Sequence, residues 1–333
     1  MRTPAKIQLL LVVSLPLALC VAAGTGAYQI HWWDIPQILW TKGQGYEVLL
    51  FVRFPRVILT AIVGASLAIS GATLQGLFRN PLADAGLIGV TAGASLGATL
   101  WIVLIGSGMF SIWGLPIAAF TGGIVVTLLV YQIARTGGRV LTVTLLLSGI
   151  AFNSIAGAGI GLMTFMADEE QLRSLTFWLL GSFGGATWQV ILANLPIALI
   201  GFCILLPLAQ PLNVITLGES EAFHLGLSVD QLKRRAVFGA ALSVGAAVSA
   251  AGGIGFVGLI IPHLLRLIAG PDHRFILPAS VLAGSILLVA ADTLARTIVA
   301  PMELPIGIIT GILGGPFFLW LLIQYKRDQP AGG

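Results

Sequence analysis

The chain has 333 residues, of which 57% are hydrophobic and only 9% are charged, and its formal net charge is +4. Soluble domains carry roughly 25% charged residues, so this composition excludes an ordinary soluble domain and indicates that the surrounding solvent is mostly lipid. The basic residues occur singly at the ends of apolar runs rather than on one face, which excludes a nucleic-acid-binding surface.

Apolar runs of the length that a membrane requires occur along the whole chain, since a spanning helix needs about 20 apolar residues. The first follows Arg2 and Lys6 and has no clear small-residue cleavage site, so we interpret it as a retained helix rather than a signal peptide. Residues 106–114, GSGMFSIWG, divide one long run, and AGGIGFVG is expected to bend the chain before the short eighth span. The ten predicted spans are residues 7–27, 56–78, 86–106, 113–134, 140–165, 189–209, 234–251, 256–269, 276–297 and 305–325. The fold class predicted is therefore an all-α, polytopic membrane protein, with residues 1–333 forming a single transmembrane domain.

Lysine and arginine are divided unevenly between the two sides that ten spans define. If both termini are cytoplasmic, twelve basic residues lie inside and five lie outside, and this bias favours that orientation. Two segments, VGASLAISG at residues 63–71 and VGAAVSAAG at 244–252, agree in register and begin helices predicted to run in opposite directions. They indicate either an inverted repeat of the kind that transporters contain or a chance likeness of small-residue helices.

Few residues suggest enzyme or metal chemistry. Cys20 and Cys203 lie in apolar runs, and the four histidines lack ligand spacing, so we predict no catalytic, cofactor-binding or metal-ligating residue. Asp292 is the best candidate for an acid within a span, and Arg296 one turn later favours an ion pair over a proton relay. No GxxxxGK followed by Ser or Thr is present, so the energy for any transport must come from a partner or an ion gradient.

A charged segment, residues 216–233, interrupts the apolar sequence. Glu219 and Glu221 suit the first turn of a short helix, Gly226 can end it, and Asp230 can cap the next helix before Lys233. The apolar face of this helix consists of Ala222, Phe223, Leu225 and Leu227. Helix chemistry alone leaves two interpretations open, a helix that enters the groove of a partner protein and a helix that lies on the membrane surface.

Several long motifs in order resemble one transporter family, from about Arg53 to the C-terminus. The motifs are RFPR (53–56), GATLQGLFRNPLADAGLIGVTAGA (71–94), LGESEAFHLG (217–226), FVGLIIPHLLR (256–266), GPDHRFILPAS (270–280), ADTLAR (291–296) and LPIGIITGILGGPFFLWLL (304–322). They resemble the permease subunits of ABC importers for iron chelates, haem and cobalamin. The resemblance implies a type II ABC importer permease fold, and a homodimer with its translocation path at the interface. It also implies two cytoplasmic ABC ATPase subunits and an external substrate-binding protein.

The resemblance also implies roles for particular residues. Residues 216–233 would be the cytoplasmic segment that couples the permease to the ATPase, through Leu217, Gly218, Glu219, Glu221, Ala222, Phe223, Leu225 and Gly226. The outward arginines Arg53, Arg56 and Arg296 would dock the binding protein through carboxylate pairs, or would instead snorkel or pair internally. Thr144, Ser148 and Asn153 of the fifth span would line the path, or would simply be small and polar residues of helix packing.

The function predicted is ATP-driven import of haem, another iron chelate or cobalamin across the bacterial cytoplasmic (inner) membrane. The chain itself would be no enzyme and would bind no cofactor, because ATP and Mg²⁺ belong to the partner ATPase. The alternative is a secondary transporter driven by an ion gradient, which ten spans and an inverted repeat also allow. It predicts several membrane acids along the path and leaves the charged segment unexplained.

Overall fold

The structure is a computed structural model that describes residues 4–26, 28, 30–106, 113–300 and 302–328. Within these residues the chain is almost entirely helical, and each of the ten predicted spans coincides with a long helix or helical segment. These are α1 (Pro4–Gly24), α3 (Phe54–Phe78), α4 (Val90–Leu100), α5 (Gly114–Ala134), α6 (Thr142–Met166), α8 (Trp188–Leu205), α11 (Val229–Ala251), α12 (Val257–Ala269), α13 (His273–Ala295) and α14 (Ile306–Asp328). The predicted division at residues 106–114 lies mostly outside the described residues.

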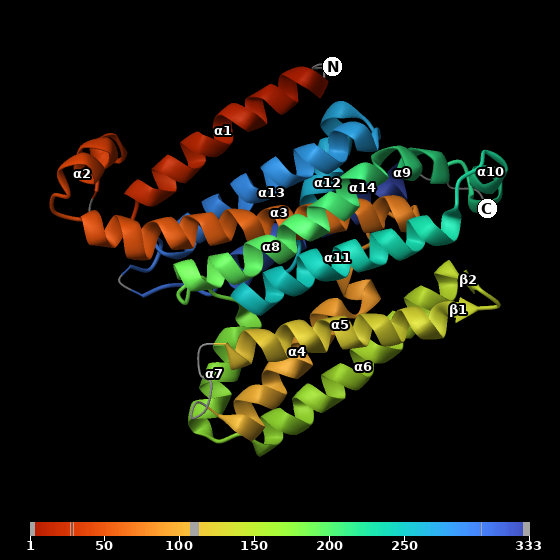
Figure 1. Cartoon of the computed structure of the whole chain (residues 1–333), viewed down its shortest axis with the longest axis horizontal. Coiled ribbons are helices and arrows are strands. Elements are labelled where there is room, and N and C mark those ends of the chain that lie inside the picture. The colour runs from red at the N-terminus through yellow and green to blue at the C-terminus, as the bar shows by residue number, and fades with distance from the viewer. Residues whose placement is uncertain (1–3, 27, 29, 107–112, 301, 329–333) are drawn as a thin grey trace.

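Short elements connect the long helices. Two π-helical segments, Val48–Arg53 and Trp101–Ile105, extend α3 at its start and α4 at its end. The remaining elements are α2 (Ile35–Thr41), α7 (Glu169–Leu180), α9 (Ala209–Ile215), α10 (Glu219–His224), three short 3-10 turns, and a hairpin of β1 (Arg135–Thr136) and β2 (Arg139–Val140). The ten long helices alternate in direction, so α1 begins, and α14 ends, at the end of the molecule that carries α10 and the hairpin (Figure 1).

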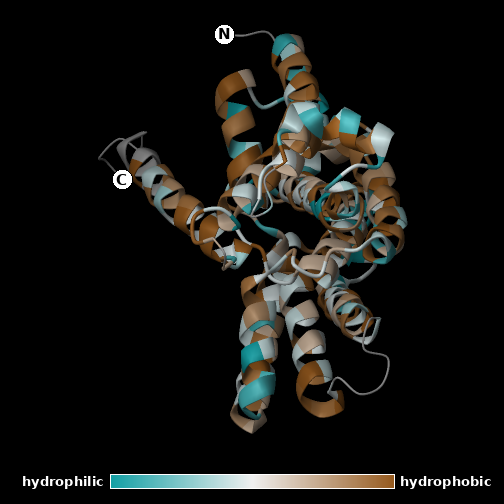
Figure 2. Ribbon diagram, turned by 90° about the vertical axis from the view of Figure 1, so that its left-hand side faces the viewer, coloured by the Kyte–Doolittle hydropathy of each residue, from teal (hydrophilic) through white to brown (hydrophobic). Residues whose placement is uncertain are grey.

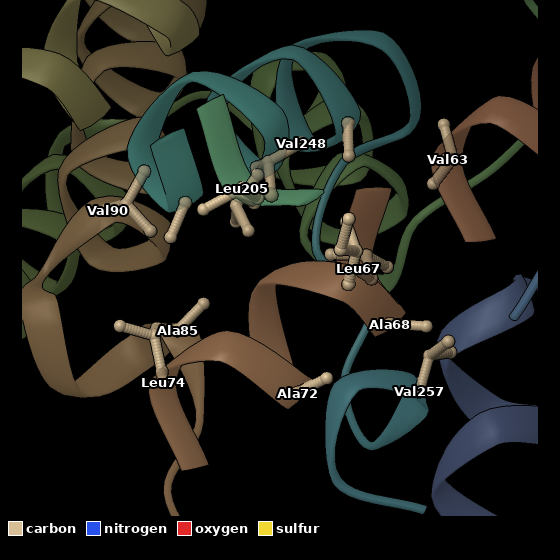
Figure 3. Packing of buried hydrophobic residues seen from close by; sticks show 14 of the residues in the cluster. Val63, Leu67, Ala68, Ala72, Leu74, Ala85, Val90, Leu205, Val248 and Val257 are labelled. Carbon is tan, nitrogen blue, oxygen red and sulfur yellow. The ribbon is translucent and has the colours of Figure 1, made fainter. Parts of the chain in front are cut away.

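Helix α3 forms the centre of the bundle. Almost every side chain between Val57 and Leu77 is buried, because α3 packs against α13, α11, α12 and α8 at once. Leu67, Ala68 and Ala72 of α3 lie among side chains from several of these neighbours (Figure 3). A helix that is apolar on all sides is typical of a core position, and the uncharged sequence of α3 between Arg56 and Arg79 therefore fits this place.

Glycines bring α3 into backbone contact with two neighbours. A Cβ on Gly64 would overlap the backbone of Gly284 in α13, and a Cβ on Gly71 would overlap the backbone of Gly258 in α12. Small residues allow helices to approach closely in lipid, where van der Waals packing replaces the hydrophobic effect as the main attraction. The prediction of a tightly packed bundle is confirmed at this seam.

The arrangement of the helices bears on the suggested inverted repeat. Helices α3 and α11, which carry the two similar segments, run in opposite directions and pack against each other (Figure 1). α3 packs closely on α13, and α11 packs correspondingly on α5, where Phe120 is the nearest neighbour of Gly245. If α3–α6 and α11–α14 are inverted repeats, α11 corresponds to α3 and α5 corresponds to α13. The contact of α3 with α13 is then equivalent to the contact of α11 with α5, as such a repeat requires.

Apolar side chains cover much of the outside of the bundle. Leu9, Val13 and Leu17 of α1, for example, are more than half exposed, as expected where lipid is the solvent. Figure 2 shows α14 projecting away from the other helices. It contacts the rest of the chain mainly through α12, α13 and α7, and among its described side chains Ile312, Leu319 and Ile323 are more than half exposed.

Two details differ from the sequence-based expectations. Asp230 does not cap α11, whose N-cap is Ser228, because the Asp230 carboxylate instead accepts the backbone N–H of Val140 at 2.9 Å. The segment between the fifth and sixth predicted spans contains a helix, α7, that no predicted span includes. There Asp168 and Gln171 form a capping box, in which each side chain accepts the other residue's backbone N–H.

Candidate functional site

The charged segment forms a compact turn between α8 and α11. Gly218, at φ 125°, separates α9 from α10, and Gly226, at φ 85°, follows α10, so both breaks use a backbone conformation that favours glycine. Ala222 is fully buried and anchors α10 on the bundle. Apolar side chains flank this anchor and point outward, with Leu217 63%, Phe223 66% and Leu225 66% exposed. The sequence-predicted short helix and its glycine stop are confirmed.

Glu219 is partly exposed, and both oxygens of its carboxylate bond to other helices. Its carboxylate accepts the Thr142 hydroxyl of α6 at 2.8 Å and the Lys233 ammonium of α11 at 2.7 Å. Lys233 also donates to the carbonyl of Val140 at 2.7 Å, and only 3% of its side chain is exposed. Charge-assisted hydrogen bonds of this kind are stronger than neutral ones. We call Glu219, Thr142, Lys233 and Val140 the coupling node.

A second polar cluster fixes α9. The Asn213 amide N–H donates to Asp272 at 2.7 Å, and its carbonyl oxygen accepts the backbone N–H of His273 at 2.9 Å. Asp272 also accepts the backbone N–H of Arg274, and this bond, with that from Asn213, holds the pKa of the Asp272 carboxyl below its usual range. α9 is thus attached to the start of α13, whereas α10 is attached to the starts of α6 and α11.

A hollow of about 450 Å³ lies beside the coupling node. It is bounded by the end of α3, the start of α6 and the side chain of Glu219. Its walls are both apolar and polar, and consist of Leu77, Phe78, Arg79, Leu141, Thr142, Val143, Thr144 and Glu219. The start of α6 therefore borders free space, and the bonded pair Thr142 and Glu219 forms part of its wall.

At the opposite end of the molecule, two arginines close the end of α1. Arg53 donates to the carbonyl oxygens of Ala23 and Gly24, each at 2.7 Å, and also to that of Tyr28. Arg296 donates to the carbonyl oxygens of Ala22 and Thr25, both at 2.8 Å. The last carbonyls of a helix lack partners within the helix, and cations are favourable there. Both arginines are more than nine-tenths buried.

Arg56 forms the third part of this outer network. It pairs with Asp292 at 2.8 Å and, through another nitrogen, with Glu303 at 2.8 Å. Asp292 also pairs with Arg296 at 3.2 Å, so the expected ion pair one helical turn apart is confirmed. Asp292 and Arg56 are buried, whereas the Glu303 side chain is 45% exposed. The three arginines are therefore engaged within the chain, and their docking role stays a prediction.

The predicted path residues on α6 do not share one open face. Ser148 is buried, and the Asn153 amide donates to the carbonyl oxygen of Gly86 at 2.9 Å, while Thr144 lines the hollow. The open face of α6 instead presents Leu147, Ile150 and other apolar or small side chains. A role for Thr144, Ser148 and Asn153 in the path stays a prediction.

Three polar residues that hold helices together at the α10 end of the molecule were not predicted to do so from the sequence. Thr142, Asn213 and Lys233 each bond across elements that are far apart in the sequence or separated by a turn. Lys233 could have been recognised from its position, because a lysine inside a long apolar helix requires a partner. No such signal marks Thr142 or Asn213, whose residue types are ordinary near helix ends.

Comparisons with known proteins agree over nearly the full length. The profile of the FecCD transport family matches residues 10–324. The chain is 42% identical over 330 residues to the hemin transport system permease protein HmuU of Yersinia pestis, covering 97% of this chain and 96% of that protein. It is 46% identical over 271 residues to the cobalamin import system permease protein BtuC of Halobacterium salinarum, covering 81% of this chain and 72% of that protein.

Solved structures agree with the fold. A metal-chelate type ABC transporter in an inward-facing conformation superposes with a TM-score of 0.86 at 34% identity, covering 96% of this chain and 99% of that one. PsaBC from Streptococcus pneumoniae, at a TM-score of 0.54 and 16% identity, shares the fold alone. With the family match over nearly the whole chain, these findings show that the chain belongs to the FecCD transport family, as a multi-pass transport permease with the type II ABC importer fold rather than a catalytic subunit.

Proposed function

We propose that the chain is the membrane path of a binding-protein-dependent importer that is driven by two cytoplasmic ABC ATPase subunits. The observation that carries this proposal is α10, where Leu217, Phe223 and Leu225 project beside the buried anchor Ala222. Exposed aromatic and aliphatic side chains on a short, well-fixed helix suit a groove on a partner protein. Glu221 and Gly226 would shape the same contact, which joins the ATPase to the permease. ATP and Mg²⁺ would be bound by the ATPase and not by this chain.

The permease would act as a homodimer with the path between the two copies. The open face of α6 and most of α14 lack partners within one subunit, and both present apolar side chains such as Leu147 and Ile312. A second copy would cover these surfaces, and the small and apolar residues of α6 would then face a path for a bulky chelate. A path of this composition binds cargo weakly enough to release it.

The permease would lie in a bacterial cytoplasmic membrane with both termini on the cytoplasmic side. The excess of Lys and Arg on the side of α10 supports this orientation. The direction of the helices agrees, since α1 begins and α14 ends on that same side (Figure 1). The outer arginine network would then face the binding protein.

Arg56 offers the most direct way to dock a binding protein. It is bonded to the exposed carboxylate of Glu303, so a carboxylate of the binding protein would take the place of Glu303. Arg53 and Arg296 would contribute by holding α1 and α13 in position for this contact. Arg–carboxylate pairing would orient the binding protein on the permease and speed its association, and would supply only a small part of the affinity.

The cargo proposed is haem or another iron chelate, with cobalamin as the second candidate. The hemin permease is similar to this chain over almost the full length of both proteins, whereas the archaeal cobalamin permease is similar over a shorter part. Both kinds of cargo are bulky, in keeping with a path lined by small residues that leave room and bind weakly.

Reconstitution tests the proposal directly. The permease, its ATPase and its binding protein would be placed in liposomes, and ATP hydrolysis and uptake would be measured with the binding protein loaded with haem, a ferric siderophore or cobalamin. We expect the binding protein loaded with haem to stimulate both. The proposal is overturned if the permease alone accumulates cargo under a proton or sodium gradient, which is the outcome that a secondary transporter predicts.

A further inference from the structure

The residues of the charged segment divide into two groups that face opposite ways. Phe223 and Leu225 point outward from α10, whereas the carboxylate of Glu219 points inward to Thr142 and Lys233. The Glu219 side chain is 40% exposed, but both of its carboxylate oxygens are bonded within the chain. These bonds suit a role of Glu219 inside the permease.

The coupling node is the polar connection between α10 and α6. α10 packs mainly against α9 and α11, and its bond to α6 runs from Glu219 to Thr142, the first residue of α6. The strand just before α6 is fixed by two further bonds to Val140, one from Lys233 and one to Asp230. The start of α6 and the strand before it are thus held by three short polar bonds, one to α10 and two to α11.

The second polar attachment, at Asn213 just before the charged segment, connects α9 to a different helix from α6. Asn213 holds α9 to the start of α13, and α13 is interlocked with α3 through the contact of Gly64 with Gly284. Gly218 separates this attachment from Glu219. A displacement of α10 can therefore reach the start of α6, which borders the hollow, by a route separate from the attachment of α9 to α13.

We propose that Glu219 is a positioning residue that transmits the displacement of α10 to α6 through the Thr142 hydroxyl. This inference rests on the proposed function, since it requires an ATPase that moves α10. The bond is directional and joins an ionised acceptor to a hydroxyl donor, so it resists stretching more than the surrounding apolar contacts. Lys233 orients Glu219, because its buried ammonium has this carboxylate as its ion-pair partner among the described residues.

The test uses the complete complex in liposomes and the variant Thr142→Val, which removes the hydroxyl and keeps the shape of the side chain. We expect the variant to assemble with the ATPase and to hydrolyse ATP, but to transport about tenfold less cargo per ATP, the size expected for losing a hydrogen bond to a charged group. Thr142→Ser retains the hydroxyl and should transport normally. Thr164→Val is the matched control, because its hydroxyl bonds only to Ile160 of the same helix.

A distance measurement separates transmission from a merely structural role. Spin labels on cysteines at Ser220 of α10 and Val143 of α6, both exposed, would be placed in a background with Cys20 and Cys203 replaced by serine. Their separation should stay constant through ATP binding and hydrolysis with Thr142 present, and should change with Thr142→Val.

Three results would overturn the inference. The first is normal transport per ATP by Thr142→Val, and the second is an equal loss of transport and ATP hydrolysis. The third is loss of assembly with the ATPase, because Thr142 would then be needed for binding the ATPase. Failure of the proposed function is distinguishable, because the wild-type complex would then show no ATP-dependent uptake at all.

Discussion

The two ends of the bundle use charge in opposite ways. At the end that we propose to be the outer one, three arginines turn inward and bond to helix-terminal carbonyls, Asp292 and Glu303. At the end that we propose to be cytoplasmic, polar groups hold helices together while Phe223 and Leu225 project outward. The outer end is thus closed by its charges, whereas the cytoplasmic end leaves apolar side chains available. The comparison shows that a charged residue at the end of a predicted span can have its bonding partners inside the protein rather than at the surface.

The largest effect is expected from Asp292→Ala, which tests whether the outer end is closed as described. The variant leaves Arg56 and Arg296 without their shared buried carboxylate. Removing one partner of a buried pair typically costs about 3–5 kcal/mol, so thermal unfolding of the purified permease in detergent should occur at clearly lower temperature. Glu47→Ala, at an exposed acid, is the control and should unfold as the wild type does. Equal unfolding of the two variants would refute the network.

The second-largest effect concerns the α10 end of the molecule, where apolar side chains are exposed. Phe223→Asp places a charge where we propose that an ATPase groove receives an aromatic ring, and it should weaken ATPase binding by at least about tenfold. Binding of the solubilised permease to immobilised ATPase would measure the change. Ser220→Asp adds the same charge on the same short helix and should bind nearly normally. If both variants bind alike, Phe223 is not part of the contact.

A smaller effect is expected from Arg53→Gln. The shorter, neutral side chain cannot cap the end of α1 with the bonds that Arg53 makes to Ala23 and Gly24, at a cost of about 1–3 kcal/mol. Hydrogen exchange followed by mass spectrometry should then show faster exchange at the end of α1. Lys42→Gln, at an exposed position, serves as the control. Unchanged exchange in Arg53→Gln, together with weaker binding-protein docking, would favour the docking role over the capping role.

The smallest effect is expected from Glu303→Gln. Its carboxylate is half exposed, and exposed ion pairs contribute about 0–1 kcal/mol, so unfolding should change little beside the Asp292 variant. Binding-protein affinity should instead rise a few-fold, because Arg56 loses a competing carboxylate. Surface plasmon resonance with immobilised binding protein measures this change, and a fall in affinity would contradict the exchange of partners at Arg56.

The helices of this fold could be predicted from the sequence, since each span is a long apolar run and lipid leaves the backbone few alternatives to a helix. The short helix at residues 219–224 was also predictable, because acids at its start and Gly226 at its end are local signals. α7 could have been found as well: Asp168 followed by Gln171 is a capping pattern. Local sequence thus carries most of the secondary structure.

The partners of the charged residues could not be predicted in the same way. Arg56 meets an acid 236 positions later, and Thr142 meets one 77 positions later. Such pairs depend on how helices pack, which a single sequence does not state. The exception is Asp292 with Arg296, whose spacing of one helical turn brings them together within the same helix. Internal pairing of the outward arginines was left open as an alternative to docking, but the partners of Arg56 could not be identified.

The glycine seam of α3 limits how this permease can change shape. Where Gly64 meets Gly284 and Gly71 meets Gly258, main chain lies directly on main chain, with no side chain between them that could swing to another rotamer. Sliding along such a seam would drive backbone atoms into one another, so the three helices behave as a single stiff block. Opening and closing must therefore take place at the edges of the block, where α6 and α14 have room to tilt.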